Sequence, residues 1–221
     1  MNTVKAIPSY AEGLTELQQN LENMLPTQVL EVFSKDAAKL EKKHASILKL
    51  TEGETAPNFT LSNALGESIN LSSLLKKGKV VLTFYRGTWC PYCNLQLNQY
   101  QQALEEIHAL GAELVGVSPQ TPDESLSMQE KNNLQFQVLS DNGNLVTRKF
   151  TTVFKNGHEP IEAMKSLGID FSAHYADDSN EIPVPAVFII EQDGKISFAK
   201  TNGGDYRSRI EVQEILDALK N

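Results

Sequence analysis

Short apolar runs separated by helical stretches constrain the fold of this chain more than any other feature. Three of them lie at Lys79–Tyr85 (KVVLTFY), Glu113–Ser118 (ELVGVS) and Val184–Ile190 (VPAVFII). A continuous apolar run of this length is typical of a strand covered on both faces. Strands that alternate with helices predict an α/β fold with a central mixed sheet flanked by helices. The helix between the first two runs is marked by the apolar residues Leu97, Tyr100, Leu104 and Ile107.

The first 50 residues show a helical periodicity instead, and they predict two helices. Ser9 and Glu12 form a capping-box pattern, and the helix they begin is broken at Pro26. We expect an N-terminal helical extension over residues 1–50 and the main domain over residues 51–221. Two roles for the extension stay open: a contact between two copies of the chain in a homodimer, or a brace against the main domain. The two apolar stripes are Leu14, Leu17, Leu21 and Met24, then Val29, Phe33, Ala37 and Leu40.

The remaining segments of the main domain carry weaker signals. FTLSN at residues 59–63 and SINL at residues 68–71 predict one hairpin, and the turn at residues 192–195 predicts a second. Residues 151–182 show no clear period and predict a loose polar connection. Residues 211–220 predict a final helix.

The charge and the amino terminus narrow the classes of partner. A net charge of −8 argues against general affinity for nucleic acid or an anionic membrane, because both require a basic surface. No apolar run approaches the length of a membrane span. The first residues lack the apolar core and cleavage site of a secretory signal. We therefore expect a cytoplasmic protein with neither nucleic acid nor a membrane as partner.

Both cysteines of the chain lie together in the segment GTWCPYC, directly after the first apolar run. Cys90 falls where the predicted strand ends and a helix begins, and Pro91 suits the first turn of a helix. Free backbone N–H groups and the helix dipole stabilise a thiolate at such a position. Cys90 and Cys93 can close a small disulfide and reopen it, so the pair is interpreted as a dithiol switch in a reducing compartment.

Other interpretations of the polar residues are less favoured. A structural zinc site needs four ligands, and the chain has no second CxxC, so only a site shared between two chains would remain. A pair of inert buried thiols is a further alternative. The segment GVSPQ at residues 116–120 resembles the nucleophile elbow of a serine hydrolase, but it ends in glutamine where that motif has glycine. It is therefore interpreted as a turn at the end of a strand. We expect no metal and no cofactor, and we expect surface or loop positions without organised partners for His108, His158 and His174.

The cysteine segment and its surroundings resemble known redox proteins. WCPYC resembles the active site of thioredoxin, and Val184-Pro185-Ala186 resembles the cis-proline that faces the dithiol in that fold. The longer frame over roughly residues 53–220 resembles the peroxiredoxin-like family, the redoxins of the alkyl hydroperoxide reductase and thiol-specific antioxidant group. The resemblance implies a thioredoxin-like fold, thiol redox chemistry and a thioredoxin-like or other dithiol reductant as partner. It rests on the segments APNFTLSNALGESINLSSLLKKGKVVLTFYRG, ELVGVSPQTPDES and FQVLSDNGNLVTRKF.

The chain also departs from both patterns. Aligned without a gap to the peroxiredoxin motif Pro-x-x-x-Thr-x-x-Cys, Arg86 replaces the proline, Cys90 the threonine, and Cys93 takes the peroxidatic position. Pro185 stands where the peroxiredoxin strand arginine would be, and Phe84 where thioredoxin has a buried acid. Two interpretations of Arg86 therefore stay open, a cation that replaces the missing arginine or an exposed residue at the end of the strand.

The resemblance also suggests roles around the two thiols. Arg86, Thr88, Trp89 and Pro185 are expected to position the substrate, and Arg207 and Arg209 follow the last strand without an assigned role. Thioredoxin-like chemistry makes Cys90 the attacking thiol, whereas the peroxiredoxin alignment makes it Cys93. Exposure and the helix dipole favour Cys90, with Cys93 as the resolving thiol.

Three functions remain after these arguments. The first is a thiol-dependent peroxidase in which hydrogen peroxide or an organic hydroperoxide oxidises one thiol to a sulfenic acid, which the other thiol condenses to a disulfide. The second is exchange of disulfides with proteins or small thiols, with Trp89 and Pro185 as the docking platform. The third is a binding module that needs neither cysteine. The surrounding frame favours the first.

Overall fold

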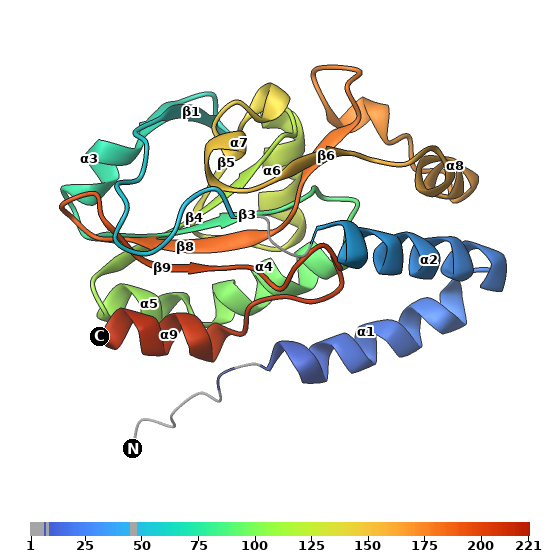
Figure 1. Cartoon of the computed structure of the whole chain (residues 1–221), viewed down its shortest axis with the longest axis horizontal. Helices are drawn as coiled ribbons and strands as arrows, with labels where there is room; N and C mark the ends of the chain where they lie inside the picture. Colours follow the sequence, from blue (N-terminus) through green and yellow to red (C-terminus); the bar gives the residue numbers. More distant parts are fainter. Residues whose placement is uncertain (1–6, 8, 45–47) are drawn as a thin grey trace.

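The computed structural model describes residues 7, 9–44 and 48–221 (Figure 1). In this part of the chain the larger sheet has seven strands in the order β2-β1-β5-β4-β3-β8-β9. β3 runs parallel to β4 and β4 to β5, whereas β8 is antiparallel to β3, so the predicted mixed sheet is confirmed. The two predicted hairpins form as β1–β2 and β8–β9.

These are the bounds of the elements. The strands of the larger sheet are β1 (Thr60–Asn63), β2 (Ser68–Asn70), β3 (Lys79–Phe84), β4 (Ala112–Ser118), β5 (Gln137–Ser140), β8 (Ala186–Ile190) and β9 (Ile196–Lys200). A smaller sheet pairs β6 (Val153–Lys155) with β7 (Glu181–Pro183). The helices are α1 (Tyr10–Met24), α2 (Thr27–Lys43), α3 (Leu71–Leu75), α4 (Pro91–Gln102), α5 (Leu104–Ala109), α6 (Pro122–Lys131), α7 (Thr147–Phe150), α8 (His158–Ser166) and α9 (Val212–Lys220), with 3-10 turns η1 (Asn142–Asn144) and η2 (Ser172–His174). None of the described helices is long and apolar enough to cross a bilayer.

The central strand β3 is covered on both faces, as its continuous apolar sequence predicts. Val80, Leu82 and Phe84 pack into one apolar cluster with residues of α3 and α7. Val81, between them in sequence, packs into the opposite cluster with residues of α4, α5 and α9. Successive side chains of a strand point to opposite faces, so one apolar run supplies two layers of core. This double cover holds the carboxyl end of β3, where the cysteine segment begins, in a fixed place.

The extension packs against the main domain of its own chain. Figure 1 shows α1 and α2 beyond one end of the sheet, with α1 beside the start of α4 and α2 facing α8. The backbone N–H of Tyr10 donates to a carboxylate oxygen of Glu211 over 2.6 Å, and Gln99 donates to the carbonyl oxygen of Ser9. The Tyr206 hydroxyl donates to the carbonyl oxygen of Phe33 over 3.0 Å. These contacts give α1 and α2 the role of a brace.

The segment at residues 151–182 is more ordered than its sequence suggests, and the expectation of a loose connection is wrong. It contains β6, α8, η2 and β7. Phe154, Met164, Phe171 and Ile182 enter a buried cluster with Leu40 and other residues of α2. The apolar positions are too widely spaced to give a clear local period, and several of their partners in the cluster, such as Ala37 and Tyr206, are distant in sequence.

The peptide bond before Pro185 is trans, so the expected cis bond is wrong. The chain passes in an extended conformation from β7 into β8. The Val184 N–H donates to the carbonyl oxygen of Thr152, and the Pro185 carbonyl oxygen accepts from the Thr201 hydroxyl. These bonds hold both flanks of the proline in the extended path, which suits the trans isomer.

The close approach of α2 to the loop after β9 makes Gly204 sensitive to substitution. Its N–H donates to the carbonyl oxygen of His44, and a methyl group there would overlap the carbonyl oxygen of Leu40. We expect Gly204→Ala to lower the free energy of unfolding by about 2–3 kcal/mol, because backbone must move to relieve the overlap. Urea denaturation measures this loss. Gly116→Ala is the matched control, since its methyl would lie 3.5 Å from Tyr85, and equal losses in the two variants would refute the argument.

Candidate active site

The fold places the two cysteines on the first turn of α4. β3 ends at Phe84, and Cys90 is the N-cap residue of α4, with Pro91 as its first helical residue. One helical turn separates Cys90 from Cys93, so both sulfurs lie on the same side of the helix start. Both thiols are free and almost fully buried, with 1% and 0% of their surface exposed. Exposure therefore does not distinguish the two, contrary to the expectation that Cys90 is the more exposed thiol.

The Cys93 sulfur receives positive charge from a residue distant in sequence. Arg209, on the segment after β9, has 4% of its surface exposed, and its Nη2 lies 3.5 Å from Cys93 Sγ. Its Nη1 donates to the carbonyl oxygens of Tyr206 and Ser208, which holds the guanidinium in place. Burial alone would lower the pKa of Arg209, but the facing Cys93 thiolate raises it. Sequence reasoning left this arginine without a role, and no local signal links it to the cysteines.

The two thiols have opposite pKa shifts. Burial is the largest influence on both and favours the neutral form. At Cys93 it is outweighed by a hydrogen bond from the Cys90 thiol, by Arg209 and by a backbone hydrogen bond from Arg86, so the Cys93 pKa lies well below its usual value. Burial and the same thiol hydrogen bond hold the Cys90 pKa well above its usual value. The surroundings thus favour negative charge on Cys93 and a proton on Cys90.

Arg86 is buried beside the thiols, so the interpretation as an exposed residue at a strand end is wrong. Its surface is 3% exposed, and its guanidinium carbon lies 3.9 Å from the centre of the Tyr206 ring and 4.8 Å from that of Trp89. Its charge acts on both cysteines and lowers their pKa values. Stacking on two aromatic rings offsets part of the cost of burying this cation.

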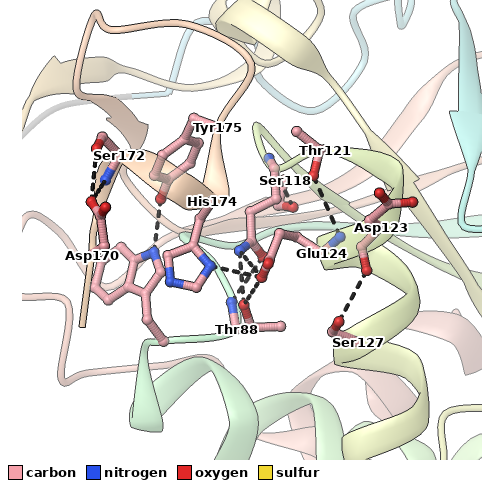
Figure 2. Close-up of polar contacts among 12 residues, drawn as sticks. Thr88, Ser118, Thr121, Asp123, Glu124, Ser127, Asp170, Ser172, His174 and Tyr175 are labelled. Atoms are coloured by element: carbon pink, nitrogen blue, oxygen red, sulfur yellow. Dashed lines mark hydrogen bonds and ion pairs between the residues drawn. The ribbon is translucent and has the colours of Figure 1, made fainter. Parts of the chain in front are cut away.

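Thr88 belongs to a polar network that fixes the turn before the cysteines (Figure 2). Its N–H donates to Gln120 Oε1 over 2.8 Å, and its hydroxyl accepts from Gln120 and donates to Glu124. His174 Nδ1 lies 2.7 Å from the same Glu124 carboxylate, so the expectation that this histidine has no organised partner is wrong. The network ties the cysteine turn to α6 and to the loop around η2.

Trp89 is held by the same loop and borders a cavity. Its Nε1–H donates to the Tyr175 hydroxyl over 2.8 Å, and that hydroxyl donates to the carbonyl oxygen of Arg86. A cavity of about 470 Å³ lies beside it, with Arg86, Cys90 and Trp89 in its wall. Cys93, Thr88 and Pro185 do not line it in the described part of the chain. Pro185 is buried between β7 and β8, and Phe84 packs in the core.

No metal site accompanies the thiols: among residues 7, 9–44 and 48–221, no three His, Cys, Asp or Glu side chains gather as ligands would. The arrangement therefore offers two adjacent thiols with opposite pKa shifts, two buried arginines and a cavity that one of the two cysteines lines. A lowered thiol pKa beside a second thiol is suited to nucleophilic attack followed by disulfide formation.

Comparisons with known proteins agree with this chemistry. Peroxiredoxin Q from the chloroplast of Sedum lineare is 34% identical over 110 residues, which are 49% of this chain and 58% of that protein. Its counterpart from Populus jackii is 33% identical over 109 residues, 49% of this chain and 50% of that protein. The chain thus matches little more than half the length of these relatives. The crystal structure of peroxidoxin BcpB from Mycobacterium tuberculosis superposes with a TM-score of 0.60 at 22% identity, over 77% of this chain and 97% of that one, and this likeness shows the fold.

The pattern of one family covers the segment that holds the site. The AhpC/TSA family matches residues 53–199, which include the whole of β3, both cysteines and all but the last residue of β9. The extension and Arg209 lie outside the match. Since the match spans more than half of the sequence and contains the thiol pair with its strand–helix junction, this chain belongs to the AhpC/TSA family.

Proposed function

We propose that this protein is a thiol-dependent peroxidase that works through a Cys90–Cys93 dithiol cycle. The observation that carries the proposal is the arrangement of the pair: Arg209 Nη2 lies 3.5 Å from the Cys93 sulfur, and Cys90, one helical turn away, lines the cavity. Membership in the AhpC/TSA family and the peroxiredoxin names of the relatives support the same chemistry.

The proposed cycle assigns a different task to each sulfur. Cys90 lines the cavity and meets the peroxide. The two thiols share one proton, which passes to Cys93 before Cys90 attacks, and the nearby charge of Arg86, which lowers the pKa of Cys90, favours this transfer. The Cys90 sulfur attacks the terminal peroxide oxygen, the O–O bond breaks, and the departing oxygen takes a proton from solvent to become water or an alcohol, while Cys93 keeps the proton that it received from Cys90. Cys90 is then a sulfenic acid, and Cys93 displaces its hydroxyl as water to form the disulfide. A dithiol donor such as a thioredoxin-like protein reduces the disulfide and is itself oxidised.

Disulfide exchange is the less favoured function on this geometry. It was expected to use Trp89 and Pro185 as a platform for a substrate backbone. Pro185 is buried and does not line the cavity, so it offers no such surface. A cycle fed by a dithiol donor requires a reducing compartment, and we propose the cytoplasm.

Consumption of hydrogen peroxide and of cumene hydroperoxide with dithiothreitol as donor tests the proposal. We expect the protein to consume at least one peroxide well above the rate of dithiothreitol alone, and we expect this excess to vanish after both thiols are alkylated. A rate equal to that of the free donor with both peroxides would refute the peroxidase. Reduction of a disulfide-bonded peptide in the same solutions then distinguishes disulfide exchange from a binding module, which would be inactive in both assays.

A further inference from the structure

The side chain of Asn94, near the start of α4, holds the backbone of the turn that carries Cys90. Its Nδ2 donates to the carbonyl oxygen of Thr88 and to that of Cys90, each over 2.8 Å. The Cys90 carbonyl oxygen also accepts from the backbone N–H groups of Cys93 and Asn94, each over 3.1 Å. No other described residue donates to the Thr88 carbonyl oxygen. Asn94 thus ties two residues that precede the helix to the helix itself.

The Asn94 amide is oriented by its partners on both sides. A carbonyl oxygen only accepts hydrogen bonds, so the two carbonyls of the turn require the nitrogen of the amide to face them. Asn94 Oδ1 then accepts from Asn132 Nδ2 over 2.8 Å. Asn132 is 8% exposed, and its Nδ2 also donates to the carbonyl oxygen of Met128. Its Oδ1 accepts from Asn98 Nδ2 over 2.8 Å. Three amides thus form a chain that restricts the rotation of Asn94.

The carbonyl group of Cys90 controls the distance between the two sulfurs. Cys90 is the N-cap residue and has an extended backbone, so it is not held as a helical residue would be. The bond from the Cys93 N–H to the Cys90 carbonyl oxygen closes a tight turn, which keeps the two Cα atoms within about 7 Å. A disulfide needs a Cα separation of about 4.4–6.8 Å. A change in the direction of this carbonyl would therefore carry the Cys90 sulfur out of bonding reach of Cys93.

We propose that Asn94 is a positioning residue for the resolving step, which keeps the Cys90 sulfenic acid against the start of α4 so that Cys93 reaches it before a second peroxide does. The inference rests on the proposed peroxidase function. When the Cys93 sulfur attacks, the S–S bond forms, the S–O bond of Cys90 breaks, and the hydroxyl leaves with the Cys93 proton as water.

The competing reaction destroys the cycle. A second peroxide transfers one oxygen to the sulfenic acid of Cys90, its O–O bond breaks, and the remainder leaves as water or an alcohol. Cys90 is then a sulfinic acid, which a dithiol donor does not reduce. Asn94 would thus set the ratio of disulfide to sulfinic acid formed in each cycle.

The position of Asn94 separates this role from a general contribution to stability. Asn94 is half-buried and lines a groove between α1, α4 and α6. After removal of the amide, solvent from this groove can donate to the two carbonyl oxygens. An exchanging water molecule does not tie Thr88 and Cys90 to the helix, however. The loss should therefore appear in the reactions of the two thiols rather than in the melting temperature.

The equilibrium between dithiol and disulfide, measured in mixtures of reduced and oxidised dithiothreitol, tests the positioning without any peroxide. We expect Asn94→Ala to lower the equilibrium constant for closing the Cys90–Cys93 disulfide about 10-fold, because the effective concentration of the two thiols falls. Asn98→Ala is the matched control on the same helix. It breaks a 2.8 Å bond of the same amide chain but leaves both bonds to the turn in place, so its constant should stay within about 2-fold of the parent value.

Mass spectrometry after turnover with hydrogen peroxide and dithiothreitol measures the ratio of the two reactions. The fraction of Cys90 found as sulfinic acid should rise about 10-fold in Asn94→Ala, since slower resolution leaves more time for a second peroxide, and should keep the parent value in Asn98→Ala. Asn94→Asp preserves the shape of the side chain, but an ionised carboxylate only accepts hydrogen bonds. It should therefore resemble Asn94→Ala in both assays.

Each outcome has a distinct meaning. An unchanged equilibrium constant in Asn94→Ala, or parent-like behaviour of Asn94→Asp, would overturn the inference. Equal losses in Asn94→Ala and Asn98→Ala would show a structural role of the amide chain and would overturn it as well. A parent protein that consumes no peroxide, together with weaker disulfide closure in Asn94→Ala alone, would refute the peroxidase while supporting Asn94 as the residue that holds the pair together.

Discussion

Cys90→Ser is expected to abolish peroxide turnover, whereas Cys93→Ser is expected to leave a slow reaction that stops at the sulfenic acid. Cys90 is the cysteine that lines the cavity, and its loss removes the thiol proposed to meet the peroxide. Cys93 supplies the base and the resolving thiol, so its loss should slow sulfenic acid formation by about 10²–10⁴-fold, the usual contribution of a positioned base. It should also leave the sulfenic acid with no partner to condense with.

The expectations for both variants can be tested by trapping the sulfenic acid with dimedone and analysing the peptide Gly87–Leu97 by mass spectrometry. The adduct should form on Cys90 in the Cys93→Ser protein and should be absent from the Cys90→Ser protein. A serine differs from a cysteine by one atom, and equal melting temperatures of the two variants would show that the fold is unchanged. Dimedone on Cys93 in the Cys90→Ser protein would reverse the roles and make the low-pKa thiolate the nucleophile.

Arg209→Met is expected to raise the pKa of Cys93 and to lower peroxide turnover at neutral pH by about 10²–10³-fold. The substitution keeps much of the side-chain length but removes the buried charge that lies 3.5 Å from the Cys93 sulfur. Without it, burial favours the neutral thiol, so less of the base needed by Cys90 is present. The size of the effect follows from the loss of one preorganised charged group in a water-poor site.

The pH dependence of thiolate absorbance measures this shift, and its sign can be stated in advance. The lowered pKa of Cys93 means that its thiolate persists below about pH 8.5, the usual thiol value, and is lost as the pH falls through the lowered value. The stability contributed by its charged form is likewise present above the unfolded value and lost as the pH falls through the folded one. The raised pKa of Cys90 keeps the second thiol neutral over the same range, so one thiolate, not two, should be seen at neutral pH.

Two further arginine variants test whether the effect depends on the position of the arginine and on its charge. Arg148→Met is the matched control, because Arg148 pairs with Glu181 at a half-exposed position and has no contact with the thiols in the described structure. Its titration and turnover should equal those of the parent. Arg209→Lys keeps the positive charge but loses the planar guanidinium with its paired N–H donors. The Cys93 pKa and the turnover of this variant should therefore lie between those of the parent and those of Arg209→Met. An unchanged titration in Arg209→Met would show that Arg209 does not stabilise the thiolate.

The strand–helix frame of the site was predictable because its signals are local. The apolar run of β3, the proline after Cys90 and the three-residue spacing of the cysteines act on neighbouring residues through backbone sterics and side-chain alternation. They place the thiols at the start of α4 without reference to the rest of the chain. The order of residues 151–182 was not predictable because it depends on distant segments: the cluster that holds Phe154 and Met164 also contains Leu40 of α2 and Tyr206 after β9.

What the sequence determined by itself is the mixed α/β fold, the position of the dithiol and its redox character. What only the tertiary structure decided is which thiol lies beside a buried arginine and which cysteine lines the cavity. Arg209 lies 116 residues from Cys93, and two of the helices that line the cavity, α1 and α2, precede the family segment. The pKa of a buried thiol depends on charges within a few ångströms, and packing of distant segments, which leaves no local pattern, selects those charges.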